Sequence, residues 1–297
     1  MIVLFWNMQR LGSGTPAKRM EMFEGVLAEA FSQIYNCDLA VLCEVVSNAV
    51  VSKHANVTVN KQAQIVRRGG AAKQQAQLGY AAIDDDMDDV ELEKLTMPSF
   101  KEVFGTTAPR KGGNIFAKHS KRSVACVDAD GARKLYVYHA NASAKAAFLV
   151  AWVAESLRQE NDGNFVLVGD LNAPPDAVKS ALQQFGVDPA KFVFVSDGHT
   201  HNAKEGATKT YDYAITGAGL AMKVRKIDIR PVVQVVAKAN LLAGAAVSAA
   251  AAGGAAAGGA AAAGGGAAAA AAGPTGKQIN DETNANMSDH MPIIVEY

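Results

Sequence analysis

The sequence predicts an α/β fold in one large domain, and three observations support this. Short apolar runs of the kind found in buried strands recur along nearly the whole chain. Longer segments between them place apolar residues three and four positions apart, as amphipathic helices do. The 297 residues are 49% hydrophobic and 20% charged, which is enough to bury a sizeable core. We therefore expect a single domain over residues 1–297.

The expected strands are short and end at polar or turn-forming residues. They lie at 2–6, 38–45, 55–59, 64–67, 78–83, 113–117, 123–128, 134–139, 165–172 (running into a loop), 192–195, 211–216, 223–236 and 292–297. Helices are expected at 17–36, 144–160 and 177–185. The acidic stretch 84–91 is interpreted as a solvated loop rather than a cation site. Residues 243–273 are almost entirely Ala and Gly, so we expect a flexible insertion between two strands of the same domain.

Charge and cysteine content exclude several classes of protein. The formal net charge is zero, so affinity for phosphates would have to come from local basic clusters and a bound cation. Cys37, Cys43 and Cys126 are too few and too irregularly spaced for a disulfide framework or a zinc site, and we expect them to be small buried residues. The apolar start at residues 1–6 is too short for a signal peptide, and no transmembrane segment is expected. The expected location is cytoplasmic, or exported without a visible signal peptide.

Polar residues close many of the apolar runs. They are Asn7, Glu44, His139, Asp170 with Asn172, Asp212, and the pair Asp289 and His290. Polar groups inside buried strands are costly unless they are paired. Strands of a layered sheet end along one rim, so we expect these side chains to converge on one site.

Taken one at a time, most of these residues have an ordinary structural interpretation as well. Asn7 is typical of a strand-end hydrogen bonder, Glu44 of a surface carboxylate, His139 of a capping residue, and Asp212 of a satisfied buried polar group. Two strings are more specific. In GDLN (169–172), the two polar residues would point to the same side of an extended chain and could address one phosphate. In SDHMP (288–292), the histidine is expected in a fixed tautomer, with an aspartate partner that could come from elsewhere in the fold.

Together these residues resemble the endonuclease/exonuclease/phosphatase superfamily, which has the fold of deoxyribonuclease I. Within it the chain is most similar to the catalytic subunits of cytolethal distending toxins. The strings that carry the resemblance are FWNMQ, LAVLCEV with SNAV, GNIFAKHSKR, HANAS, GDLNAPP, YDYAITG and SDHMP. The resemblance implies a four-layer α/β/β/α sandwich with two mixed, mainly antiparallel sheets packed face to face.

The resemblance also implies roles for the polar residues. Mg²⁺ (or Mn²⁺) would be held by Glu44 with support from Asn7, and Asp289 would join the metal cluster or position its histidine neighbour. Asp170 would orient or deprotonate the attacking water. Asn172 would donate to a phosphate oxygen, and His139 and His290 would flank the phosphate. Asp212 would orient His139.

Residues that would contact the substrate are harder to identify. The resemblance places phosphate contacts near Arg110, Lys111 and Asn114. Short basic clusters at 67–68, 110–111 and 118–122 could follow a phosphate backbone, but basic residues in turns equally serve solubility. The string His199-Thr200-His201 is expected to have a loop role, since no matching ligand spacing accompanies it.

The leading functional hypothesis is a metal-dependent endonuclease that nicks double-stranded DNA. A phosphatase acting on phosphoinositides or another phosphomonoester is the second hypothesis, because the same core serves both chemistries. An abasic-site endonuclease is disfavoured, because no aromatic residue precedes SDHMP to act as a wedge. A binding module that keeps only the fold is the alternative outside enzymes. Partner subunits are not identifiable from the sequence.

Overall fold

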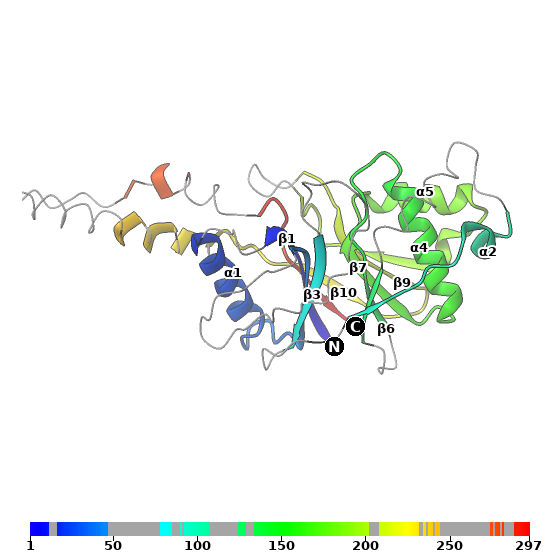
Figure 1. The fold of residues 1–297 in the computed structure, drawn as a ribbon, viewed down its shortest axis with the longest axis horizontal. Coiled ribbons are helices and arrows are strands. Elements are labelled where there is room, and N and C mark those ends of the chain that lie inside the picture. The colour runs from blue at the N-terminus through cyan, green and yellow to red at the C-terminus, as the bar shows by residue number, and fades with distance from the viewer. Residues whose placement is uncertain are drawn as a thin grey trace, which may run out of the picture.

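Two β-sheets form the centre of the molecule in the computed structural model (Figure 1). The structure describes residues 1–11, 17–46, 78–84, 90, 92–106, 124–128, 134–201, 208–231, 234–235, 237–239, 241–243, 274–275, 277–279, 281 and 288–297. The strands expected at 55–59, 64–67 and 113–117 lie outside these residues, as do nearly all of the acidic stretch and of the Ala/Gly segment.

Each sheet is mixed but mainly antiparallel. The five-stranded sheet has the order β10 (Lys223–Lys226), β11 (Ile293–Glu296), β1 (Ile2–Leu11), β2 (Leu39–Val46), β3 (Leu78–Asp84). The six-stranded sheet has the order β4 (Glu93–Lys94), β5 (Ala125–Asp128), β6 (Lys134–Val137), β7 (Phe165–Asp170), β9 (Asp212–Gly217), β8 (Phe192–Val195). The parallel pairs are β1 with β2 and β6 with β7, while the other neighbours in both sheets run antiparallel.

Helices cover the outer faces of both sheets. Helix α1 (Ala17–Ala30) packs on the five-stranded sheet, where Phe23 and Leu27 join Leu4 and Trp6 of β1 in one apolar cluster. On the six-stranded sheet lie α2 (Phe100–Phe104), α4 (Ala146–Glu160) and α5 (Pro175–Gln184), followed by a 3₁₀ turn at Pro189–Lys191. Figure 1 shows α1 on one side of the molecule and α4 with α5 on the other.

A third apolar cluster fills the space between the sheets. It joins Val3 and Phe5 of β1 to Val166 and Val168 of β7, all of them fully or almost fully buried. Because side chains alternate along a strand, the intervening residues of these strands belong to the two outer clusters instead. The layers are therefore helix, sheet, sheet, helix, and the expected four-layer sandwich is confirmed.

Element boundaries depart from the predictions where local backbone chemistry intervenes. The strand expected at 223–236 is wrong beyond Lys226, since Arg230 and Pro231 are already helical. Proline has no N–H to give to a sheet ladder but is well suited to the first turn of a helix. The first helix ends at Ala30 rather than 36, in turns that lead to Asn36 at a φ of 49°.

Helix α2 was not predicted from the sequence, although a signal for it was present. Ser99 accepts a hydrogen bond from the N–H of Glu102, and the Glu102 carboxylate accepts one from the N–H of Ser99. This reciprocal arrangement is a capping box, recognisable in the string SFKE. All three cysteines are free and buried, as expected. Among the described residues, no helix combines the length and the apolar character needed to cross a bilayer.

Candidate functional site

Strand alternation places the predicted site residues between the two sheets, at one rim. Val3 and Phe5 of β1 face the inter-sheet core, so the next residue of that parity, Asn7, faces it too. In the same way Val166 and Val168 lead to Asp170 on β7, and Leu135 and Val137 lead to His139 just beyond β6. Each apolar inner face thus ends in a polar side chain at the same edge of the sandwich.

Buried polar residues are concentrated at this rim. Ten polar or charged residues among the described ones are buried, and seven of them lie here. The seven are Asn7, His139, Asp170, Thr200, Asp212, Ser288 and His290. Burying so many polar groups in one place costs free energy unless they form hydrogen bonds with one another. These residues do form such bonds.

The imidazole of His290 is held by Asp212, not by its neighbour Asp289. His290 Nδ1 lies 3.0 Å from Asp212 Oδ1 and 2.9 Å from Oδ2. The segment that carries it is fixed to β1, since Trp6 Nε1 donates to the His290 carbonyl at 3.1 Å and Ser288 Oγ donates to the Asn7 carbonyl at 2.9 Å. Asp212 was expected to orient His139, and that assignment is wrong because its carboxylate faces His290.

A single carboxylate oxygen, Asp170 Oδ2, lies at the centre of the site. Asn7 Nδ2 donates to it at 2.9 Å. His139 Nε2 lies 3.4 Å from the same oxygen, and His290 Nε2 lies 3.7 Å from it. Strand β7 and the segment after β6 therefore meet strand β1 and the segment before β11 at one carboxylate.

The two buried carboxylates lie directly opposite each other, in register on the antiparallel strands β7 and β9. Like charges in such a pair repel, and His290 offsets this by placing one ring nitrogen near each. Burial alone lowers the pKa of His290, but the charges of Asp212 and Asp170 outweigh it and raise the pKa to about 10. Burial raises the pKa of Asp170 to about 7, partly opposed by the nearby His290 charge.

A β-bulge directs Glu44 to the site. The β2–β3 register shifts between Cys43 and Val45, and Glu44 has a φ of 60°. In a regular strand Glu44 would share the helix side with Leu42, whereas the bulge changes its direction. Its carboxylate Oε1 lies 3.6 Å from His139 Nε2, and the side chain is 19% exposed. The backbone of His139 is fixed from across the sandwich, because its N–H donates to the Tyr80 hydroxyl at 2.7 Å.

Asn172 is near the site, but not in the extended geometry that the GDLN string suggested. Strand β7 ends at Asp170, and Asn172 has a φ of 48°, a left-handed conformation that Asn tolerates well. Its backbone N–H donates to Asp170 Oδ1 at 3.2 Å, and its Nδ2 donates to the Ala140 carbonyl at 2.9 Å. The residue thus fixes the Asp170 carboxylate and links the chain after β7 to the chain after β6.

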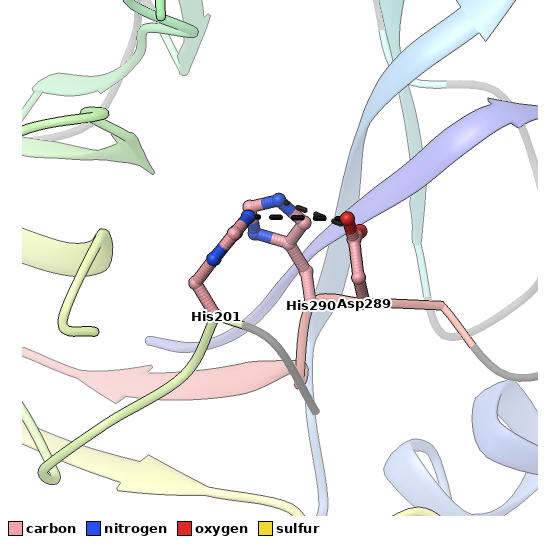
Figure 2. Close-up of side chains that lie close together, drawn as sticks. All are labelled: His201, Asp289 and His290. Atoms are coloured by element: carbon pink, nitrogen blue, oxygen red, sulfur yellow. Dashed lines mark ion pairs between the residues drawn. The ribbon is translucent and has the colours of Figure 1, made fainter. Parts of the chain in front are cut away.

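Asp289 and His201 complete one side of the site (Figure 2). Asp289 Oδ1 lies 3.7 Å from His290 Nε2, and Asp289 Oδ2 lies 3.9 Å from His201 Nε2. The His201 and His290 rings make an edge contact, with centroids 4.6 Å apart. Thr200 supports the same corner, since its Oγ1 accepts the Asp212 N–H at 3.0 Å.

Residues outside the expected set therefore contribute to the site. His201 was expected to have only a loop role, and the HTH string that contains it was the available signal. Tyr80 and Ser288 were also missed, although Ser288 belongs to the SDHMP string. The three expected substrate contacts, Arg110, Lys111 and Asn114, lie outside the described residues.

The donors at the rim fit a divalent cation. Glu44 offers a partly exposed carboxylate beside His139, and Asp289 offers another that is 31% exposed, beside His201 and His290. Oxygen donors of this kind suit Mg²⁺ or Mn²⁺. Of the three expected metal ligands, Glu44 and Asp289 contact different histidines, while Asn7 donates to Asp170. Asp289 groups with His201 and His290 within 4.8 Å.

No family model matches the chain, and no curated protein matches it. Solved structures similar to it include the cytolethal distending toxin of Actinobacillus actinomycetemcomitans, at 12% identity over 100% of this chain and 97% of that one, with a TM-score of 0.48. An endonuclease/exonuclease/phosphatase family protein of Bacteroides thetaiotaomicron aligns at 11% identity over 76% of this chain and 87% of that one, with a TM-score of 0.45. The human Nocturnin catalytic domain aligns at 14% identity over 77% and 86%, also with a TM-score of 0.45.

Proposed function

We propose that the chain is a divalent-metal-dependent phosphodiesterase that nicks DNA. The observation that carries the proposal is the position of Asp170 Oδ2, with the Nε2 atoms of His139 and His290 at 3.4 Å and 3.7 Å. A carboxylate flanked by two imidazoles provides a proton acceptor and two donors within reach of one tetrahedral phosphate.

Asp170 is suited to accept a proton from the attacking water. Burial brings its pKa to about 7, so near neutral pH it is partly ionised and its conjugate acid is only weakly acidic. Asn7 and the Asn172 N–H each bind one of its oxygens, which fixes the direction of the carboxylate. The residue therefore combines a suitable pKa with a fixed orientation.

His290 is suited to donate. With its pKa raised to about 10 it is an imidazolium at neutral pH, and Asp212 at Nδ1 leaves Nε2 as the nitrogen that faces the site. Nε2 can stabilise a phosphoryl oxygen or pass its proton to the leaving oxygen. His139, held between Glu44 and Asp170, can donate from the other side.

A divalent ion held by Glu44 with Asn7 or Asp289 would neutralise phosphoryl charge and make a bound water more acidic. Its removal is the first test. We expect the protein to relax supercoiled plasmid in Mg²⁺ and to lose this activity when a chelator is added.

The matching variant test uses two histidines. His290→Ala should lower plasmid relaxation by about 10²–10⁴-fold, the usual contribution of an acid–base group. His199→Ala removes an exposed histidine in the loop between β8 and β9, and this variant should retain activity. Release of phosphate from a phosphoinositide without nicking would replace the nuclease with the phosphatase, and inactivity on both substrates would leave a binding module.

A further inference from the structure

The corner formed by His201, Asp289 and His290 contains ligand atoms that the proposed reaction does not use together. His201 Nε2 and Asp289 Oδ2 are 3.9 Å apart, and Asp289 Oδ1 and His290 Nε2 are 3.7 Å apart. Figure 2 shows both rings and the carboxylate directed toward one another. We propose that these residues form a site for a first-row transition-metal ion such as Zn²⁺, which leaves Glu44 with Asn7 to hold Mg²⁺.

The donor set favours Zn²⁺ over Mg²⁺. Two imidazole nitrogens and one carboxylate are typical of a three-ligand zinc site with one open position, whereas Mg²⁺ prefers oxygen ligands and keeps its waters. Tetrahedral Zn²⁺ with bonds of about 2.0–2.1 Å would place its ligand atoms roughly 3.4 Å apart. The pairs at 3.7 Å and 3.9 Å use different oxygens of Asp289, and one ligand atom from each of the three residues lies within 4.8 Å of the others. Side-chain shifts that close this spacing would bring the three residues to that geometry.

An outer carboxylate already orients one of the ligands. Metal-binding histidines usually donate their second ring nitrogen to a carboxylate, which fixes the tautomer and raises the basicity of the ligating nitrogen. Asp212 holds Nδ1 of His290 in this manner at 2.9 Å, so Nε2 is the atom presented to an ion. The carboxylates of Asp212 and Asp170 lie 2.9 Å and 3.7 Å from the two ring nitrogens of His290, so they add negative charge that attracts a cation to this corner.

The backbone on the His201 side is fixed as well. His201 forms isolated β-bridges with Lys209 and with His290, so both ligand histidines belong to one local pairing. The His201 N–H donates to the Lys209 carbonyl at 2.9 Å. Side-chain exposures of 24% for His201 and 31% for Asp289 leave the corner accessible to an ion.

Binding at this corner has a consequence that rests on the proposed function. An ion on Nε2 of His290 would occupy the atom from which the proton is donated. We therefore expect Zn²⁺ to inhibit the Mg²⁺-supported reaction, and His201→Gln to relieve that inhibition when each variant is compared with its own rate in Mg²⁺ alone.

The direct test does not depend on activity. Co²⁺ added to the full chain should give the visible absorption of a tetrahedral site, and added Zn²⁺ should remove it by competition. His201→Gln and Asp289→Asn should each weaken Zn²⁺ binding measured by calorimetry by about 100-fold, and Asp212→Asn by about 10- to 100-fold.

His199→Gln is the matched control, because it removes an exposed histidine two positions from His201 while leaving the three ligands in place. Unchanged Zn²⁺ affinity in both His201→Gln and Asp289→Asn would overturn the site, as would an equal loss in His199→Gln. Failure of plasmid cleavage together with normal Co²⁺ absorption would overturn the nuclease and leave the metal site standing.

Discussion

His290 shows how burial and charge compete at a single residue. Its pKa is raised to about 10 from 6.5, so its ion pair contributes stability fully below about pH 6.5, and this contribution is lost as pH rises through 10. The raised pKa of Asp170 also lowers stability as pH rises, because the folded form retains the proton more readily than the unfolded form. This effect falls between pH 3.8 and about pH 7. In the metal-free protein, both groups therefore make folding less favourable as pH rises.

Replacing Asp212 tests this charge balance. Asp212→Asn keeps the size of the side chain but removes the charge that does most to raise the pKa of His290, so that pKa should fall. Ring-resonance titration by NMR in the presence of a chelator measures it. Asp289→Asn is the comparison and should give a smaller shift, because Asp289 is more exposed and contributes less. An unchanged His290 titration in Asp212→Asn would contradict this account.

At the scale of elements, the sequence was sufficient to predict the apolar strands but not the irregularities within them. The polar residues that follow the apolar runs IVLFW, KLYVY and FVLVG were sufficient to predict that Asn7, His139 and Asp170 converge at one rim. The β2 bulge that directs Glu44, and the left-handed turn at Asn172, depend on partner strands that a local pattern does not contain. His201 was missed for the same reason, because its contact with His290 spans distant segments.

Because of the bulge, we expect the residue that best suits folding at position 44 to differ from the one that activity requires. A φ of 60° costs an L-residue about 1 kcal/mol, whereas glycine adopts it freely. In metal-free protein, Glu44→Gly should therefore be more stable than Glu44→Ala by about 1 kcal/mol in urea unfolding. Both variants should lose plasmid relaxation. Equal stability of the two would show that the bulge imposes no strain.

At the scale of the whole molecule, the site exists only where the two sheets meet. The five-stranded sheet supplies Asn7 and Glu44 and orients His290, while the six-stranded sheet supplies Asp170 and Asp212. The sequence could indicate that strand ends converge, but the pairing of Asp212 with His290 follows from packing between layers. A contact that holds the layers in place should therefore matter to activity as well as to folding.

Tyr80 provides such a contact, from β3 to the backbone of His139. Tyr80→Phe removes the hydroxyl that accepts the His139 N–H, so we expect a loss of about 1 kcal/mol in unfolding free energy and roughly a 10-fold loss of plasmid relaxation. Tyr136→Phe is the matched control, because that hydroxyl bonds to Asn161 beside the helix layer, away from the site. Its removal should lower stability and leave the rate intact. If the two variants lose activity equally, His139 is not positioned through Tyr80, and the activity loss only reflects a weaker fold.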